Sequence, residues 1–235
     1  FCCHGSNTKV DEATYCNYRK SGMYRETARV CIGNYLMKPV LVLYYSRHGS
    51  TRKLADAIAQ GVISTGAEAW VRTVKPLNEG DGHAQDNTNL AAPVVTDEEL
   101  VQCSALALGS PTRFGNMAAS VKHFLDSTSS QWLKGALINK PACVFTSSSS
   151  MHGGQESTLL SMMLPLMHHG MVICGLPYSE PELHNTMTGG SPYGVTHVAH
   201  HSHASPEQLS DDERALCFAQ GKRLARLAEK LKEER

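Results

Sequence analysis

The stretch VLYYSRHGSTRKLADAIAQ, residues 42–60, joins a strand directly to a helix. Its first residues are mostly apolar, as expected of a strand that is buried on both faces. From Leu54 onward, apolar residues recur at helical spacing. Between the two lies the turn SRHGST, residues 46–51, which is rich in hydroxyl groups and bent by a glycine. Such a strand–turn–helix unit indicates a binding site for a phosphate group.

Strand and helix patterns alternate along the chain after Met37. Apolar runs predict strands over residues 40–45, 67–74, 104–110, 141–150 and 171–177. Apolar residues at helical spacing predict helices over residues 51–66, 116–128, 155–170 and 206–235. We expect Pro165 to kink or break the third helix. The alternation predicts an α/β fold, a five-stranded, mainly parallel sheet with helices on both faces and loops at 75–92 and 178–205.

Three polar loops that contain glycine each follow a predicted strand. They are SRHGST (46–51), GSPTRFGN (109–116) and TSSSSMHGG (146–154). The carboxyl ends of parallel strands meet at one edge of a sheet, and open α/β sheets bind their ligands at this edge. We therefore expect the three loops to build one ligand site.

The SRHGST loop has the chemistry of an anion site. Its small residues let several backbone amides point at one position. The following helix adds free N–H groups and the positive end of its dipole. Ser46, Ser50 and Thr51 add hydroxyl donors, and the loop has no acidic residue. It lacks the GxxxxGKS/T pattern of nucleotide triphosphatases and the GxGxxG pattern of dinucleotide sites. In the alternative interpretation, Ser50 or Thr51 only caps the helix.

The other two loops suit a planar heteroaromatic ligand. Thr112, Arg113 and Phe114 offer a hydroxyl group, a cation and an aromatic face. The serine-rich loop supplies many backbone and hydroxyl donors with little side-chain bulk. In the alternative interpretation, Phe114 belongs to the core, Arg113 is a surface charge and the serine-rich loop is a flexible linker. The position of that loop between a strand and a helix argues against a linker.

Composition excludes several other classes of protein. The chain has 22 basic and 22 acidic residues, whereas a dedicated nucleic-acid binder normally has a basic excess. No apolar run reaches the length of roughly 18 residues that spans a bilayer. The cysteines include no CxxC pair, so a zinc site has no support and we expect a reduced, cytoplasmic protein.

Two segments do not fit the repeating pattern. Residues 1–36 show no clear periodicity, and we expect a non-native or poorly ordered extension before one domain at 37–235. A cysteine-rich regulatory arm is the alternative. The segment HVAHHSH, residues 197–203, could bind a transition metal. No acidic residue or cysteine lies beside it in the sequence, so we expect no physiological metal site.

Several motifs together resemble one protein family. They are YYSxxG, GSPTRFGNM, HGGQE and HHGMVI, with FLD and Trp132 after the second. From about Met37 to the C-terminal helix, the chain resembles the WrbA-type NAD(P)H:quinone oxidoreductases of the flavodoxin-like fold. The resemblance implies an FMN cofactor, NAD(P)H and a quinone as substrates, a two-electron reduction and a homotetramer, with a dimer possible.

The same resemblance implies the roles of individual residues. The FMN phosphate would lie against Ser46, Arg47, His48, Gly49, Ser50 and Thr51. The flavin and its ribityl chain would lie against Thr112, Arg113 and Phe114. The isoalloxazine edge would lie against Ser147, Ser148, Ser149, Ser150, Met151, His152 and Gly153. His168 would contact FMN, His48 the nicotinamide nucleotide and Trp132 the quinone. We expect no side chain to act as a catalytic acid or base, because the flavin carries the chemistry.

The chain departs from the family pattern in two loops. His48 stands where the compared family member has Tyr, and the serine-rich loop has Met151 and His152 as additions. We expect Trp132 to lie on an exposed loop near the flavin. The family resemblance implies that such loops form part of the wall of a neighbouring subunit's site. In the alternative interpretation, Trp132 folds back on its own domain. In the alternative interpretation of the His168–His169 pair, these histidines only cap helix carbonyl groups.

Two other functions stay open at this point. One is a non-enzymatic electron carrier of the flavodoxin type, although such carriers are usually smaller and acidic, and this chain is neutral. The other is a phosphorylation-switched receiver domain. A receiver domain needs clustered acidic residues after the first strand, where this chain has Tyr44, Tyr45 and Ser46.

Overall fold

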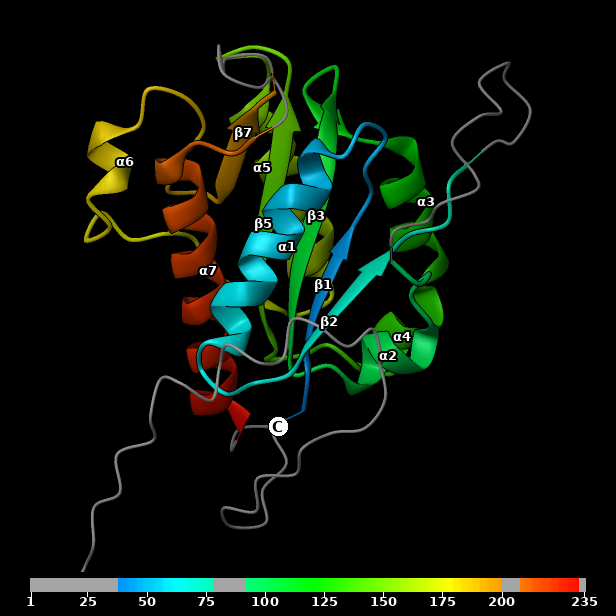
Figure 1. Ribbon diagram of the computed structural model, residues 1–235. Coiled ribbons are helices and arrows are strands. Elements are labelled where there is room, and N and C mark those ends of the chain that lie inside the picture. Colours follow the sequence, from blue (N-terminus) through cyan, green and yellow to red (C-terminus); the bar gives the residue numbers. More distant parts are fainter. Residues whose placement is uncertain (1–37, 78–91, 200–207, 233–235) are drawn as a thin grey trace, which may run out of the picture. The chain divides into compact units, whose positions relative to one another are not determined.

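The computed structural model describes residues 38–77, 92–199 and 208–232 (Figure 1). The extension expected at 1–36 and most of the HVAHHSH segment lie outside these residues. Within the described chain, one sheet is formed by the strands β1 (Val40–Tyr44), β2 (Ala69–Thr73), β3 (Ala105–Arg113), β4 (Asn116–Met117), β5 (Pro141–Ser148), β6 (Val172–Ile173) and β7 (Val195–Val198).

The strand order is that of a doubly wound sheet. β1 lies between β2 and β3, and β5 follows β3, all in parallel pairing. β6 pairs with the start of β5 and β7 with its end, so these two short strands share the fifth position. β4 only extends the end of β3 as an antiparallel partner. The predicted five-stranded parallel sheet is confirmed, with its last strand in two pieces.

The division of this last strand corrects two sequence predictions. The strand expected at 171–177 ends at Ile173, and the loop expected at 178–205 contains β7 and the short helix α6 (Glu182–Asn185). All four residues of β7 are buried, but Thr196 and His197 interrupt its apolar pattern. A pattern based on hydropathy therefore misses it.

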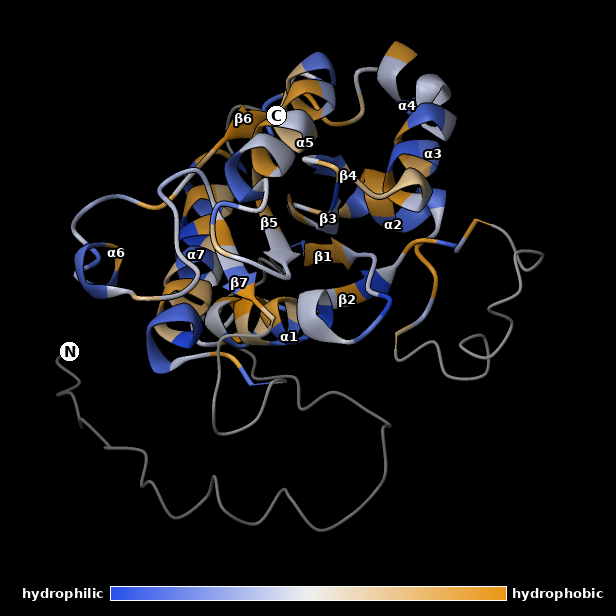
Figure 2. Cartoon of the chain, turned by 90° about the horizontal axis from the view of Figure 1, so that it is seen from above, coloured by the Kyte–Doolittle hydropathy of each residue, from blue (hydrophilic) through white to orange (hydrophobic). Residues whose placement is uncertain are grey.

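Helices cover both faces of the sheet (Figure 2). α1 (Ser50–Ile63) and α7 (Asp211–Lys230) lie on one face, and α3 (Ala119–Ser127) and α5 (Gln155–His168) lie on the other. The short helices α2 (Asp97–Gln102) and α4 (Ser129–Leu133) were not predicted. Pro165 lies inside α5 without breaking it, and the amide of His169 still donates to the Pro165 carbonyl at 3.1 Å. Across the described ranges, no helix combines the length and apolar composition needed to cross a membrane.

Each face of the sheet has its own core. Along β1, Val40, Val42 and Tyr44 belong to the core beneath α1 and α7. Leu41 and Leu43 belong to the core beneath α3 and α5. This alternation follows from the two-residue period of a strand, and it explains why the opening stretch of the sequence is apolar throughout.

Candidate functional site

The three predicted loops meet at the carboxyl edge of the sheet. The hydroxyl groups of Thr51 and Ser147 lie 2.9 Å apart, which joins the first loop to the third. The Thr112 hydroxyl donates to the Gly154 carbonyl at 3.4 Å, which joins the second loop to the third. A Cβ added to Gly154 would lie 2.8 Å from the Cα of Gly115, so these backbones approach closely. The predicted convergence of the loops is confirmed.

The first loop leaves the start of α1 open. Gly49 precedes the helix with a φ of 90°, and among the described residues no side chain caps the helix amides. Ser46 Oγ accepts a hydrogen bond from the Gly49 amide at 3.1 Å. The alternative in which Ser50 or Thr51 caps α1 is therefore wrong. An uncapped helix start with no acidic residue in its first turn is suited to an anion.

The second loop is the tight hairpin between β3 and β4. Thr112 pairs with Met117 and Arg113 with Asn116. Phe114 and Gly115 form its tip, with φ values of 53° and 74°. The Phe114 side chain is fully exposed, and Arg113 is exposed as well, so the assignment of Phe114 to the core is wrong. The hairpin instead holds an aromatic ring free at the edge of the site.

The third loop is ordered by its own hydroxyl groups and by the next helix. Ser147 and Ser148 end β5 and are buried, while Ser149, Ser150, Met151 and His152 are exposed. The Ser148 hydroxyl donates to the Ser150 carbonyl at 2.7 Å. A Cβ added to Gly153 would lie 2.9 Å from the Ser150 carbonyl oxygen. The Ser148 hydrogen bond and the close approach at Gly153 argue against a simple linker.

Trp132 and His168 lie together, but away from the three loops. The Trp132 indole N–H donates to the His168 carbonyl at 2.8 Å. α5 starts after the serine-rich loop and runs back along the sheet, so its last residue, His168, lies about 20 Å from that edge at 1.5 Å per residue. The end of α5 lies beside the start of β5. The amide of Asn139, just before β5, donates to the carbonyl of Gly170, just after α5, at 3.0 Å. Trp132 lies on α4 rather than on a loop.

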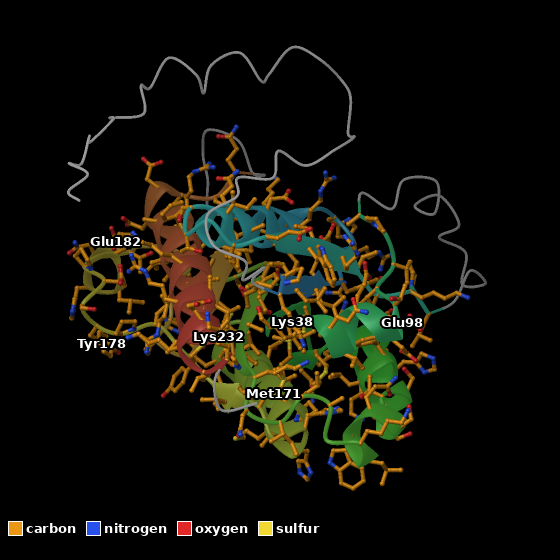
Figure 3. All side chains as sticks on the ribbon, turned by 90° about the horizontal axis from the view of Figure 1, so that it is seen from below. Lys38, Glu98, Met171, Tyr178, Glu182 and Lys232 are labelled. Atoms are coloured by element: carbon orange, nitrogen blue, oxygen red, sulfur yellow. The ribbon has the colours of Figure 1, made fainter. Side chains whose placement is uncertain are left out.

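Figure 3 shows this amino edge of the sheet from below, with Lys38 before β1 and Met171 before β6. Within one chain, therefore, the predicted contacts of Trp132 and His168 lie at the edge opposite the phosphate loop. His169 is buried beside them, and its Nε2 lies 2.9 Å from the Thr128 hydroxyl. Burial, and secondarily the neighbouring His168, lower the pKa of His169.

The sequence analysis missed a buried pair at the loop edge. His197 Nδ1 lies 2.8 Å from Glu213 Oε2, and both side chains are almost completely buried. In the sequence, His197 is part of a histidine cluster that has no acidic residue beside it. Its partner comes from α7, 16 residues along the chain, so no local pattern reveals it. Within the described ranges, no group of three or more metal-ligating side chains lies together.

Residues 39–179 match the family model described as NADPH-dependent FMN reductase. This match covers more than half of the chain. The chain belongs to this family. The FMN reductase match begins just before β1 and therefore includes all three loops of the site.

Two relatives agree with this family assignment, and a solved structure agrees with the fold. A protein of Geotalea daltonii named NAD(P)H dehydrogenase (quinone) is 43% identical over 201 residues, covering 82% of this chain and 97% of that protein. A protein of the same name from Syntrophobacter fumaroxidans is also 43% identical, covering 82% and 98%. The structure of a flavodoxin, WrbA-like protein from Agrobacterium tumefaciens has a TM-score of 0.60 at 22% identity, covering 83% of this chain and 99% of that chain. The predicted family and the flavodoxin-like fold are confirmed.

Proposed function

We infer that the protein is an FMN-dependent NAD(P)H dehydrogenase that reduces quinones by two electrons. The prediction of an NAD(P)H- and FMN-dependent enzyme is confirmed by the family and by the names of the relatives. The observation that carries the proposal in the structure is the uncapped start of α1, which has no acidic residue in its first turn. It lies beside two loops that suit a flavin.

The described residues fit an FMN molecule. Ser46, Arg47, His48, Gly49, Ser50 and Thr51 would hold its phosphate through amides and hydroxyl groups at the helix start. Phe114 and its neighbours Thr112 and Arg113 would border the flavin and ribityl chain. Residues 147–153 would follow the isoalloxazine edge. The bound flavin supplies hydride transfer from NAD(P)H to the quinone, which takes up one further proton to become a quinol.

Exposed side chains would position the substrates. We propose that His48, which is exposed beside the phosphate loop, contacts the nicotinamide nucleotide. We propose that Trp132 covers the quinone and that His168 contacts FMN. Because these two lie at the far edge of their own chain, they would act in a second copy of the protein.

A homotetramer, with a dimer as the simpler alternative, would supply this second copy. The outward face of α5 supports assembly, because Leu160, Leu164 and Met167 recur at helical spacing and are 46%, 58% and 51% exposed. Monomeric proteins rarely leave such a continuous apolar stripe exposed. The hydrogen bond from Trp132 to the His168 carbonyl places the indole beside the last residue of α5, at the end of this stripe.

We also place the protein in a reducing, cytoplasmic compartment. Cys143, Cys174 and Cys217 carry free, buried thiols in the described part of the chain. Free thiols are typical of that compartment.

The proposed function is tested by the visible spectrum of the purified protein and by steady-state kinetics. We expect flavin absorption bands and NAD(P)H oxidation by a benzoquinone, with parallel lines in a two-substrate analysis because both substrates use one flavin face. Ser50→Glu should abolish FMN binding by placing a carboxylate at the helix start. Reduction only through a partner reductase would instead favour the electron-carrier function.

A further inference from the structure

One nitrogen of the buried His197 side chain has no partner. Its Nδ1 contacts Glu213, but its Nε2 is buried and makes no hydrogen bond to any described residue. The side chain is only 3% exposed. An orphaned polar atom in the interior costs free energy, so a ligand group that pairs with this nitrogen would gain a hydrogen bond at little cost.

The Glu213 carboxylate determines which proton the ring carries. Oε1 accepts from the amides of Gly189 at 2.9 Å and Val198 at 3.2 Å. Oε2 accepts from the Ser210 amide at 2.9 Å as well as from His197. Burial raises the pKa of Glu213, but the hydrogen bond from His197 and the backbone amides lower it on balance. An ionised carboxylate only accepts, so Nδ1 of His197 donates and Nε2 stays available.

His197 lies next to the start of α1. It pairs directly with Ser147 across β7 and β5, so the two side chains lie on the same face of the sheet. The Ser147 hydroxyl lies 2.9 Å from that of Thr51, in the first turn of α1. α1 also packs against β7. Nδ1 is bonded to Glu213 of α7, so Nε2 is the ring nitrogen that is left without a bond in the described chain.

We propose that Nε2 of His197 is a direct hydrogen-bonding partner of the FMN phosphate and discriminates FMN from riboflavin. This inference rests on the proposed phosphate site at 46–51. One proton shared between Nε2 and a phosphate oxygen makes the bond, whether the ring donates to the dianion or accepts from the monoanion. Glu213 holds the ring in place and is a positioning residue.

The test compares FMN with riboflavin, which lacks the phosphate. Apoprotein is titrated with each ligand by flavin fluorescence, for the unchanged protein and for His197→Asn. The Asn amide can keep the bond to Glu213 while removing the Nε2 position. We expect FMN affinity to fall about ten- to hundredfold and riboflavin affinity to stay unchanged. Phosphorus NMR of bound FMN should show a shifted phosphate resonance in the variant.

Two further variants make the outcome decisive. His184→Asn, the same change at an exposed histidine of α6, should alter neither affinity. His197→Gln, which keeps an amide near the Nε2 position, should retain more of the FMN preference than His197→Asn. A folded His197→Asn protein with full FMN preference and an unshifted phosphate resonance would overturn the inference. If the unchanged protein does not prefer FMN over riboflavin, the proposed phosphate site itself is wrong.

Discussion

Phe114 is held in a backbone conformation that aromatic residues rarely adopt. Its φ is 53°, and the turn with Gly115 needs a positive φ at both positions. A left-handed conformation costs an L-residue about 1–2 kcal/mol. The fully exposed ring recovers none of this through burial in the isolated chain. We infer that the ring is kept at the hairpin tip for the flavin rather than for the fold.

Replacing Phe114 should therefore lower the affinity for FMN without lowering the stability of the apoprotein. We expect Phe114→Gly to leave the apoprotein as stable as before, or up to about 1 kcal/mol more stable, because glycine relieves the strain at some cost in chain entropy. FMN affinity should fall about two- to tenfold with the loss of the aromatic face. Urea unfolding and flavin titration measure the two effects. Phe114→Ala, which removes the ring but keeps the strain, should bind as weakly and be less stable than the glycine variant.

Glu213 connects three separate segments through one carboxylate. It accepts hydrogen bonds from Gly189, from His197 and Val198 of β7, and from Ser210 before α7. Because its pKa is lowered in the folded chain, its ionised form contributes stability that is present above the ordinary value of about 4.5. This contribution is lost as the pH falls through the lowered folded pKa.

Glu213→Gln should remove that pH-dependent contribution. At pH 7 we expect a loss of about 1–3 kcal/mol, because the NH2 of Gln would replace one carboxylate oxygen and face donors from which it cannot accept. The difference from the unchanged protein should shrink as the pH falls below about 4.5. Thermal melting at both pH values measures it. Asp126→Asn, at an exposed surface pair, is the control and should change stability little. An equal difference at both pH values would contradict the linkage.

At the scale of elements, α1 and α7 cross at two glycines. A Cβ on Gly61 would lie 2.1 Å from the Phe218 carbonyl oxygen, and a Cβ on Gly221 would lie 2.0 Å from that of Ile58. Both obstacles are backbone atoms, so a side chain at either position would have to separate the helices. Both helices also pack against β7, where Glu213 of α7 contacts His197 and Thr51 of α1 contacts Ser147, the strand neighbour of His197.

Gly61→Ala tests this crossing. In an exposed helix, alanine in place of glycine stabilises by about 1 kcal/mol. Here we expect a loss of about 1–3 kcal/mol, because overpacking outweighs the gain in helix propensity. Urea unfolding of the apoprotein gives the value. Gln60→Ala, at the exposed neighbouring position, should change stability by less than about 0.5 kcal/mol. A more stable Gly61→Ala protein would mean that the helices do not approach this closely.

At the scale of the whole molecule, the proposed site is divided between two opposite edges of the sheet. The phosphate and flavin loops lie at the carboxyl edge of the sheet, and the Trp132–His168 contact lies at the amino edge. No hinge within a single domain brings two opposite edges of one sheet together. The proposed quinone site therefore requires an assembly, and the apolar face of α5 is where we expect the copies to meet.

Leu164→Lys should break this assembly. We expect sedimentation to show a smaller species than the unchanged protein, because a charge then lies in the middle of the apolar stripe. FMN binding should persist, since the phosphate loop is intact, whereas quinone reduction should fall strongly. Phe218→Lys, a change of the same kind at a partly exposed position on α7, should affect neither property. A monomeric unchanged protein with full quinone activity would refute the shared site.

The sequence by itself determined the strands β1, β2, β3 and β5, the main helices and the three loops. These follow from signals that are local in the chain: the apolar run before Ser46, the helical spacing after Gly49, and the glycine and hydroxyl residues between them. Parallel strands bring their carboxyl ends to one edge, so the convergence of the loops also followed from local patterns. The motifs were specific enough to identify the family.

Only the tertiary structure decided which distant residues meet. β7 completes the sheet although Thr196 and His197 interrupt its apolar pattern, because the buried His197 finds a polar partner in Glu213 of α7. The length and direction of α5 placed His168 at the far edge, which no motif records. The physical reason is the same in both cases. Burial and pairing depend on neighbours that the chain supplies from far along the sequence, and hydropathy patterns report only the nearest residues.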